Sequence, residues 1–253
     1  MLSMSGIDLI RFMRSLRGVS FYLRDFIRIK KQQKASSILF PMQGLWPCLS
    51  DKFAEGGSAS GQYFHQDLLV AKKIFDNKPI THVDVGSRID GFVAHVASFR
   101  KIEIFDIRFV TNYIHNIKFV QCNMMGEIDK SFVDYCDSLS CLHALEHFGL
   151  GRYGDPIKYD GYLDGLNNFS KILKKGGIFY LSVPIGTQRI EFNAHRVFSI
   201  DYLISILDDR FELVNLSYID DHGDLHENAQ ISTGIKDNFG CNFGCAVFEL
   251  KKK

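Results

Sequence analysis

The chain has 253 residues, 46% of them hydrophobic, which suffices for one α/β domain with an appendage. Its formal net charge of +1 gives no reason to expect nucleic acid as a partner. The six cysteines are scattered, mostly within apolar runs, so we expect a reducing, cytoplasmic compartment. No uncharged apolar run approaches the ~20 residues that a membrane helix needs, and no secretory signal is expected.

A basic amphipathic helix is predicted over residues 7–30. Residues 1–34 contain eight Lys or Arg residues against two Asp residues, and we treat them as a separate helical segment. Such a helix can make a peripheral contact with an anionic membrane, here the inner membrane. Alternatively, its apolar stripe packs on the protein's own core or on a second subunit of a homo-oligomer. Gly18 weakens the helix. The stripe consists of Leu9, Phe12, Leu16, Val19, Leu23 and Phe26.

The remainder, 35–253, is expected to form an α/β domain that begins with a connector or lid over 35–62. This connector contains two prolines, the single tryptophan and the small-residue run Gly56–Gly61. A helix over 63–75 follows, and Pro79 prevents it from continuing.

From residue 80 onward, apolar strand-like runs alternate with helix-length segments. This alternation predicts right-handed crossovers and a doubly wound, mostly parallel sheet of seven strands. The expected helices are 91–98, 162–173 and 199–207, the last capped by Ser199. The expected strands are 80–85, 101–105, 117–121, 132–141, 178–183, 211–218 and 245–250.

Polar residues fall at the carboxyl ends of the first four predicted strands, where open α/β sheets bind ligands. Gly86 permits a sharp turn after the first strand. Asp106 ends the second strand, and its two carboxylate oxygens can accept both hydroxyls of a ribose; its alternative is a helix cap. Asn123, after the third strand, can bind an adenine edge or simply form a turn. The fourth strand ends near His143, Glu146 and His147.

Four segments in this order resemble class I S-adenosylmethionine-dependent methyltransferases: Val83–Gly86, the acidic strand end at Asp106, Asp137–His147 and Leu173–Pro184. The resemblance spans about residues 60–220. It implies a Rossmann-like sheet whose last strand is antiparallel, and S-adenosylmethionine as the cofactor.

Three further segments are similar to an uncharacterised methyltransferase-like bacterial group that is associated with surface-polysaccharide gene clusters. They are Tyr63–Asp67, Gly149–Asp155 and Arg189–Arg196. This similarity implies O-methylation of a sugar, nucleotide-sugar or lipid-linked glycan. The alternative is a non-catalytic binding or scaffold module of a glycan assembly complex. A nicotinamide-dependent oxidoreductase is disfavoured, because the second glycine of a dinucleotide turn is missing.

The resemblance also implies roles for individual residues. Arg88 stands where many members of the family have glycine, so either the turn is displaced or Arg88 projects outward. The implied cofactor-binding residues are Asp84, Gly86, Arg88, Gly91, Asp106, Ile107, Asn123, Met124, Cys141 and His143.

A sugar hydroxyl is poorly acidic, so methyl transfer to it benefits from a general base. We expect His147 and His195 to be the catalytic bases. No metal site is expected, although an alternative is a divalent cation held by Asp155, Asp220 and Asp221 together with His195 or Glu191. Arginines can hold a phosphate or a carboxylate bidentately. The expected substrate-binding residues are Tyr153, Asp155, Arg189, Asn193 and Arg196.

Overall fold

A computed structural model of the protein describes residues 9–38, 40–54, 56–57, 59–111 and 113–253. Contacts between residues divide the chain into two units, Met1–Ser58 and Ala59–Lys253. The predicted connector, 35–62, is therefore shared between the two units. Within the described residues, no helix is long and apolar enough to cross a membrane.

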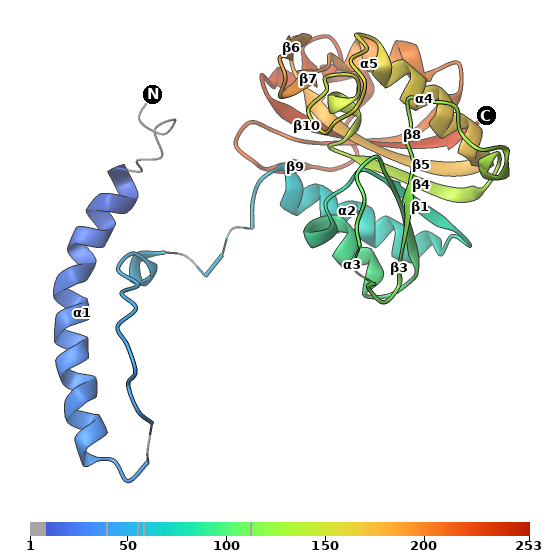
Figure 1. The fold of residues 1–253 in the computed structure, drawn as a ribbon. Helices are drawn as coiled ribbons and strands as arrows, with labels where there is room; N and C mark the ends of the chain where they lie inside the picture. Colours follow the sequence, from blue (N-terminus) through green and yellow to red (C-terminus); the bar gives the residue numbers. More distant parts are fainter. Residues whose placement is uncertain (1–8, 39, 55, 58, 112) are drawn as a thin grey trace. The chain divides into compact units, whose positions relative to one another are not determined.

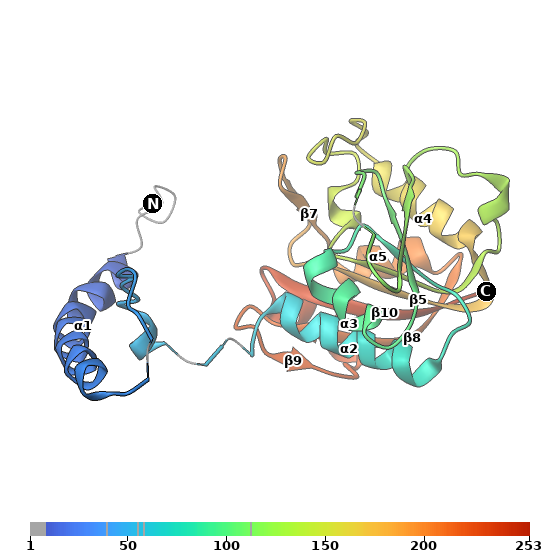
Figure 2. The same cartoon turned by 60° about the horizontal axis from the view of Figure 1, so that its bottom comes forward.

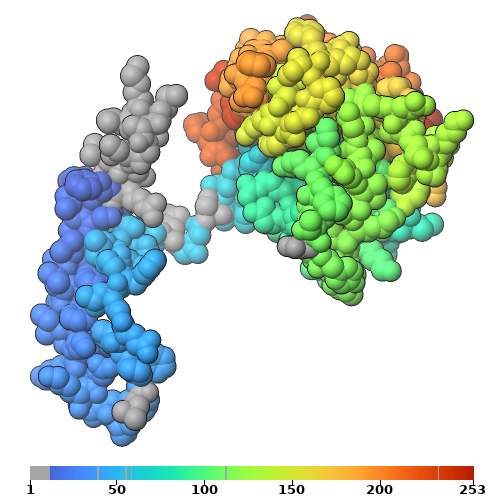
Figure 3. Space-filling model, in the orientation of Figure 1, coloured from blue at the N-terminus to red at the C-terminus, as the bar shows by residue number. Residues whose placement is uncertain are grey.

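The first unit consists of one helix and the segment that folds back along it. Helix α1 (Leu9–Ala35) confirms the predicted helix in its described part and continues beyond it; residues 7 and 8 lie outside the described residues. Gly18 is required, because a β-carbon there would lie 1.9 Å from the carbonyl oxygen of Leu49. The rings of Phe21 and Phe53 meet edge to face at 5.8 Å. The space-filling view shows the following segment lying along the helix (Figure 3).

Most of the predicted apolar stripe does not face this returning segment, although Phe26 lines a groove together with Met42 and Leu45. Phe12, Leu16, Val19 and Leu23 are each at least 40% exposed. The face that packs is the one that carries Gly18 and Phe21. Four of the six predicted stripe residues thus form an uncovered apolar row on α1.

The second unit contains an eight-stranded sheet in the order β3-β2-β1-β4-β5-β10-β8-β9. The first five strands in this order are parallel to one another, whereas β10 is antiparallel to both β5 and β8. The predicted mostly parallel sheet with an antiparallel last strand is confirmed. The strands are β1 (His82–Val85), β2 (Ile102–Asp106), β3 (Ile117–Gln121), β4 (Cys136–Leu142), β5 (Leu173–Ile185), β8 (Phe211–Ile219), β9 (Leu225–His226) and β10 (Gly244–Lys252).

Helices cover both faces of the sheet (Figure 1). On one face lie α2 (Gln62–Asn77) and the short α3 (Ala94–Ala97), and Val70, Ile74 and Val96 are fully buried there. On the other face lie α4 (Gly161–Ile172) and α5 (Ile200–Leu207), which bury Phe169 and Leu203. Ser199 caps α5 by accepting a hydrogen bond from the backbone of Tyr202, as predicted. A one-turn helix, α6 (Ile231–Gly234), precedes β10.

Several local elements differ from the prediction. A π-helical turn (Ile89–Val93) precedes α3, so the predicted helix 91–98 is irregular at its start. The fourth strand begins at Cys136 rather than at 132, because 130–132 form a 3₁₀ turn. The sheet has eight strands rather than seven, because Leu225–His226 adds a short strand beside β8. A separate hairpin, not predicted, follows β5 and consists of β6 (Arg189–Glu191) and β7 (His195–Val197) (Figure 2).

Candidate active site

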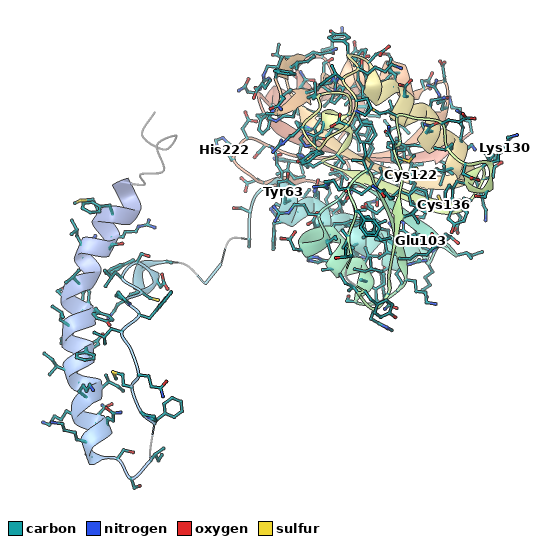
Figure 4. All side chains as sticks on the ribbon, in the orientation of Figure 1. Tyr63, Glu103, Cys122, Lys130, Cys136 and His222 are labelled. Carbon is teal, nitrogen blue, oxygen red and sulfur yellow. The ribbon has the colours of Figure 1, made fainter. Side chains whose placement is uncertain are left out.

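One cavity lies at the carboxyl ends of the parallel strands. Strands β1 to β5 each contribute to it, through the residues at or just beyond their last positions. Tyr63 in the first turn of α2 and Cys122 just after β3 are labelled in Figure 4. The position agrees with the general rule for open α/β sheets. Its lining includes Gln62, Tyr63, Val85, Gly86, Arg88, Phe105, Asp106, Ile107, Arg108, Cys122, Asn123, Met124, His143, Glu146, His147, Arg152, Tyr153, Asp155, His195 and Phe243.

The turn after β1 is built around Gly86. Its φ of +73° is in the left-handed region, and a β-carbon there would lie 3.0 Å from that of Ala144. Asp84, in β1, stabilises the turn by accepting hydrogen bonds from the backbone N–H and hydroxyl of Ser87 and from the hydroxyl of Ser140. Burial raises the pKa of Asp84 to about 6. Asp84 therefore shapes the turn and does not line the cavity, in contrast to the expectation.

Arg88 projects outward from this turn. Its side chain is 68% exposed and forms a bidentate pair with Asp90, at 2.8 and 3.0 Å. It is among the lining residues, but this exposed side chain does not fill the cavity. Gly91, in contrast, does not line the cavity: its backbone lies against α2, where a β-carbon would meet the carboxylate of Asp67 at 2.8 Å.

Asp106 ends β2 and faces the cavity, as predicted, but its carboxylate already has a partner. Arg108 donates from its backbone N–H and Nε to Oδ1, at 2.8 and 3.0 Å, and from Nη2 to Oδ2 at 2.7 Å. The Arg108 guanidinium also lies 4.6 Å from the ring centroid of Tyr153. The Asp106 side chain is only 8% exposed, whereas that of Arg108 is half exposed.

The next strand ends supply mainly apolar walls. Ile107 and Met124 line the cavity, as does Asn123. The carboxamide oxygen of Asn123 accepts from the backbone of Met125, so this side chain serves at least as a turn former. Cys141 lies inside β4 in the core and does not reach the cavity, although it was expected to line the cofactor channel.

Two histidines and a glutamate form a buried cluster beyond β4. His143 Nδ1 lies 3.0 Å from Glu146 Oε1, and His147 Nε2 lies 3.7 Å from the same oxygen. Burial opposes protonation of His143, but Cys245 and the Glu146 carboxylate raise the pKa of the His143 imidazole well above its usual range. Chiefly through burial, the pKa of His147 is lowered. His143 therefore tends to carry the proton while His147 stays neutral.

Hydrogen bonds define which nitrogen of His147 is basic. Its Nδ1 lies 2.7 Å from the carbonyl oxygen of Ala194, which can only accept, so Nδ1 carries the hydrogen. Nε2 is then the basic nitrogen. Within the described residues, the buried His143 Nε2 and Glu146 Oε2 have no hydrogen-bond partner, whereas His195 Nε2 lies 3.3 Å from Glu191 Oε2. Such unpaired polar atoms in a cavity are available to a ligand.

The Asp155 carboxylate holds together the loop of residues 149–155, which lines one side of the cavity. This carboxylate accepts from the backbone N–H groups of Gly149, Gly151 and Tyr153, at 2.8 to 3.1 Å. Tyr153 is thereby presented at the cavity, where its ring meets that of His147 edge to face at 5.2 Å. Asp155 and Tyr153, both expected to bind the substrate, line the cavity, but the Asp155 carboxylate is occupied by its own loop.

Three predicted substrate-binding residues lie away from the cavity. The Arg196 guanidinium is buried and donates to the carbonyl oxygens of Glu146, Phe148 and Tyr159, so it braces the wall of the site. Arg189 pairs with Glu191, and Asn193 is exposed. These positions contrast with the expected role in holding a substrate anion, because the hairpin of β6 and β7 directs only His195 into the cavity.

The cavity also contains residues that the sequence analysis did not select. Arg108 and Arg152 both lie near the ring of Tyr153, and Gln62, Tyr63 and Phe243 come from distant parts of the chain. Arg108 follows Asp106 closely enough to have suggested an ion pair; the others had no local signal. No group of three His, Cys, Asp or Glu side chains in the described part of the chain is arranged to hold a metal ion.

Solved structures with the same fold include the following three. The N1-methyltransferase of 1,6-didemethyltoxoflavin from Burkholderia thailandensis, solved with S-adenosylhomocysteine, is 15% identical, with a TM-score of 0.51 over 74% of this chain and 78% of that one. The N-methyltransferase NodS from Bradyrhizobium japonicum WM9, also solved with S-adenosylhomocysteine, is 10% identical, with a TM-score of 0.51 over 76% and 88%. The [4+2]-cyclase SpnF is 12% identical, with a TM-score of 0.51 over 83% and 84%.

The fold is thus that of the class I S-adenosylmethionine-dependent methyltransferases, as the resemblance implied. No curated protein matches the sequence significantly. Residues 96–224, about half of the chain, match the family described as "Caenorhabditis protein of unknown function, DUF268", and the chain belongs to this family.

Proposed function

We propose that the protein is an S-adenosylmethionine-dependent methyltransferase. The observation that supports this most strongly is the convergence of the Gly86 turn, Asp106 and the His143–Glu146–His147 cluster on one cavity. That cavity lies where the fold binds nucleotides. The solved structures of the Burkholderia and Bradyrhizobium methyltransferases contain S-adenosylhomocysteine, which supports the choice of cofactor.

The residues present fit an adenosyl cofactor. Gly86 leaves space that a β-carbon would fill, Asp106 offers two oxygens for a ribose, and Ile107 and Met124 form apolar walls for a base. Bound S-adenosylmethionine would supply a methyl group on a cationic sulfonium. Asp106 would first have to exchange its Arg108 partner for the ribose hydroxyls.

His147 is the best placed general base among the cavity histidines. Its Nδ1–H is fixed by Ala194, and its lowered pKa leaves Nε2 unprotonated at neutral pH. His195 is the second candidate, since it lines the cavity and its Nε2 lies 3.3 Å from the Glu191 carboxylate. A base is needed when the acceptor is a poorly acidic hydroxyl. We therefore propose an oxygen of a sugar, nucleotide-sugar or lipid-linked glycan as the acceptor, in the cytoplasm and in surface-polysaccharide biosynthesis.

The test of cofactor binding is a calorimetric titration with S-adenosylhomocysteine. Replacing Asp106 by Ala should weaken binding about 10- to 100-fold, because the ribose loses hydrogen bonds to a charged acceptor. Asp90→Ala is the matched control, since Asp90 also pairs with an arginine but does not line the cavity. If the Asp106→Ala protein binds as tightly as the unaltered chain, Asp106 does not hold the ribose.

A second candidate is a non-catalytic module that uses the cavity for binding alone. SpnF, a cyclase, shows that this fold also occurs outside methyl transfer. The Arg108–Asp106 ion pair favours this alternative, because it occupies the carboxylate that a cofactor would use. An unaltered chain that binds neither S-adenosylmethionine nor S-adenosylhomocysteine at millimolar concentration would support the alternative over the enzyme.

We further propose that α1 makes a peripheral contact with an anionic membrane. Its exposed apolar row, at Phe12, Leu16, Val19 and Leu23, lies on a helix rich in Arg and Lys. Apolar insertion and attraction to anionic headgroups act together in such helices. The same row also fits a helix-to-helix contact in a homo-oligomer.

A further inference from the structure

Two guanidinium groups gather on a single aromatic ring at the cavity. The carbon of the Arg108 guanidinium lies 4.6 Å from the Tyr153 ring centroid, and that of Arg152 lies 5.2 Å from it. All three side chains line the cavity. The aromatic ring attracts each cation, while the two like charges repel each other. An anion near both would relieve that repulsion.

The carboxylates around this pair leave one positive charge unmatched. Asp106 neutralises Arg108, and Asp155 is occupied by backbone N–H groups of its own loop. Glu146 faces histidines. Among the ion pairs of the described residues, Arg152 has no carboxylate partner; its Nη1 donates to the carbonyl oxygen of Ala194.

Cofactor binding would change the number of arginine charges that are paired with carboxylates at the cavity. If the ribose takes the oxygens of Asp106, the Nε and Nη2 donors of Arg108 lose their acceptors. Arg108 and Arg152 would then present two unmatched guanidinium groups at the same cavity. Paired arginines of this kind bind phosphate through several charge-assisted hydrogen bonds.

We propose that Arg108 and Arg152, gathered on Tyr153, bind a phosphate or diphosphate group of the acceptor, and that the cofactor completes this site by releasing Arg108 from Asp106. The inference rests on the proposed function and specifies its substrate class: a sugar phosphate, a nucleoside-diphosphate sugar or a phosphate-linked lipid glycan. Arg108 acts as a specificity-determining residue that couples the two ligands. Coupling is reciprocal, so the phosphate should also tighten cofactor binding by the same factor.

Calorimetry on the full chain with inorganic pyrophosphate tests the proposal. Pyrophosphate should bind about tenfold more tightly with saturating S-adenosylhomocysteine than without it, as expected for one released charge-assisted contact. Arg152→Gln should weaken pyrophosphate binding in both conditions. Arg108→Gln should remove the difference between the conditions and should itself bind S-adenosylhomocysteine more tightly than the unaltered chain, because Asp106 is then uncovered.

Three further variants separate recognition from misfolding. Tyr153→Phe keeps the ring and should retain pyrophosphate binding, whereas Tyr153→Ala should weaken it. Arg100→Gln removes a positive charge beside the amino end of β2, at the opposite edge of the sheet, and should change nothing. Competition of pyrophosphate by vesicles that contain phosphatidic acid would support the site and assign its phosphate to a lipid; binding without such competition would support it with a soluble acceptor.

Calorimetry separates a failure of the proposed function from a failure of the phosphate site alone. Lack of S-adenosylhomocysteine binding in both the unaltered chain and Arg108→Gln would overturn the proposed function and the coupling with it. If S-adenosylhomocysteine binds but pyrophosphate affinity is insensitive to it, or is unchanged in Arg152→Gln, this inference alone is overturned. Weaker S-adenosylhomocysteine binding by Arg108→Gln would also overturn it, since Arg108 would then support the cofactor rather than compete with it.

Discussion

Asp84 illustrates how a single buried residue fixes the shape of the site. Its carboxylate is fully buried and accepts three hydrogen bonds from Ser87 and Ser140, yet it contributes nothing to the cavity surface. The three donors only partly compensate for burial, since the pKa of Asp84 is raised to about 6. The glycine turn therefore depends on a carboxylate that resists ionisation.

The raised pKa predicts a pH-dependent difference in stability between the unaltered chain and Asp84→Asn. The folded state favours the protonated form of Asp84. The stability that this protonation gives the folded protein is fully present below the pKa of Asp84 in the unfolded chain, and it is lost as the pH rises through the folded-state pKa of about 6. The loss amounts to about 3 kcal/mol for a shift of about two pKa units. Urea unfolding at pH 4 and pH 7 should show Asp84→Asn gaining relative stability at the higher pH. Parallel pH profiles for the two proteins would refute the assignment.

The two histidines beside Glu146 are expected to titrate in opposite directions from the ordinary value. His143 should keep its proton at higher pH, because Glu146 stabilises its imidazolium, and His147 should lose its proton at lower pH, chiefly because it is buried. Carbon-detected NMR titration of the imidazole rings checks this, with His143→Gln and His147→Gln identifying the signals. A higher pKa for His147 than for His143 would remove the reason for naming His147 the base.

Helix α1 packs with one face and exposes most of its apolar stripe on another. Gly18 allows the backbone at Leu49 to approach closely, which explains a residue that otherwise only weakens the helix. The stripe residues that remain uncovered lie next to basic side chains. Periodicity located the helix correctly but did not predict which face would be covered.

The uncovered row predicts a membrane test for α1. Exchanging Leu16 and Leu23 together for Asp should reduce binding to vesicles that contain anionic lipid. The two exchanges remove apolar side chains that would insert and lower the positive charge of the helix. Ile38→Asp is the control, because this side chain is also exposed but follows the helix. Co-sedimentation measures the bound fraction. Equal binding by the double variant and the control would leave oligomer packing as the explanation for the row.

For the molecule as a whole, the two units are expected to be independent in stability. The buried clusters of the described residues contain only members from Val70 onward, so the α/β unit has its own core. Cleavage near Gly56–Gly57, where space around both residues is open, should leave the thermal midpoint of 59–253 unchanged. Differential scanning calorimetry of the cleaved and intact protein provides the measurement. A lowered midpoint after cleavage would show that the first unit stabilises the second.

Sequence patterns predicted the sheet better than the site. Strand–helix alternation gave seven of the strands and the edge where ligands bind, because each strand is an apolar run of its own. The site depends on hydrogen bonds between distant residues, which such patterns do not contain. Thus Arg196 donates hydrogen bonds to backbone carbonyl oxygens and does not face the cavity as an anion-binding residue would. Cys141 is buried in the core. Phe243, which is far away in the sequence, reached the cavity only through the loop before β10.

The place of β10 in the sheet has a consequence for how the nascent chain matures. Among the described strands, β8 and β9 join the parallel strands only through β10, which is translated after both. As the polypeptide emerges from the ribosome, β1 to β5 can pair with one another while β8 has no neighbour but β9. β10, made after both, then inserts between β5 and β8 and joins the two parts of the sheet. Pauses in translation between residues 219 and 244 should therefore prolong the lifetime of an open edge, the state in which such proteins are most prone to aggregate.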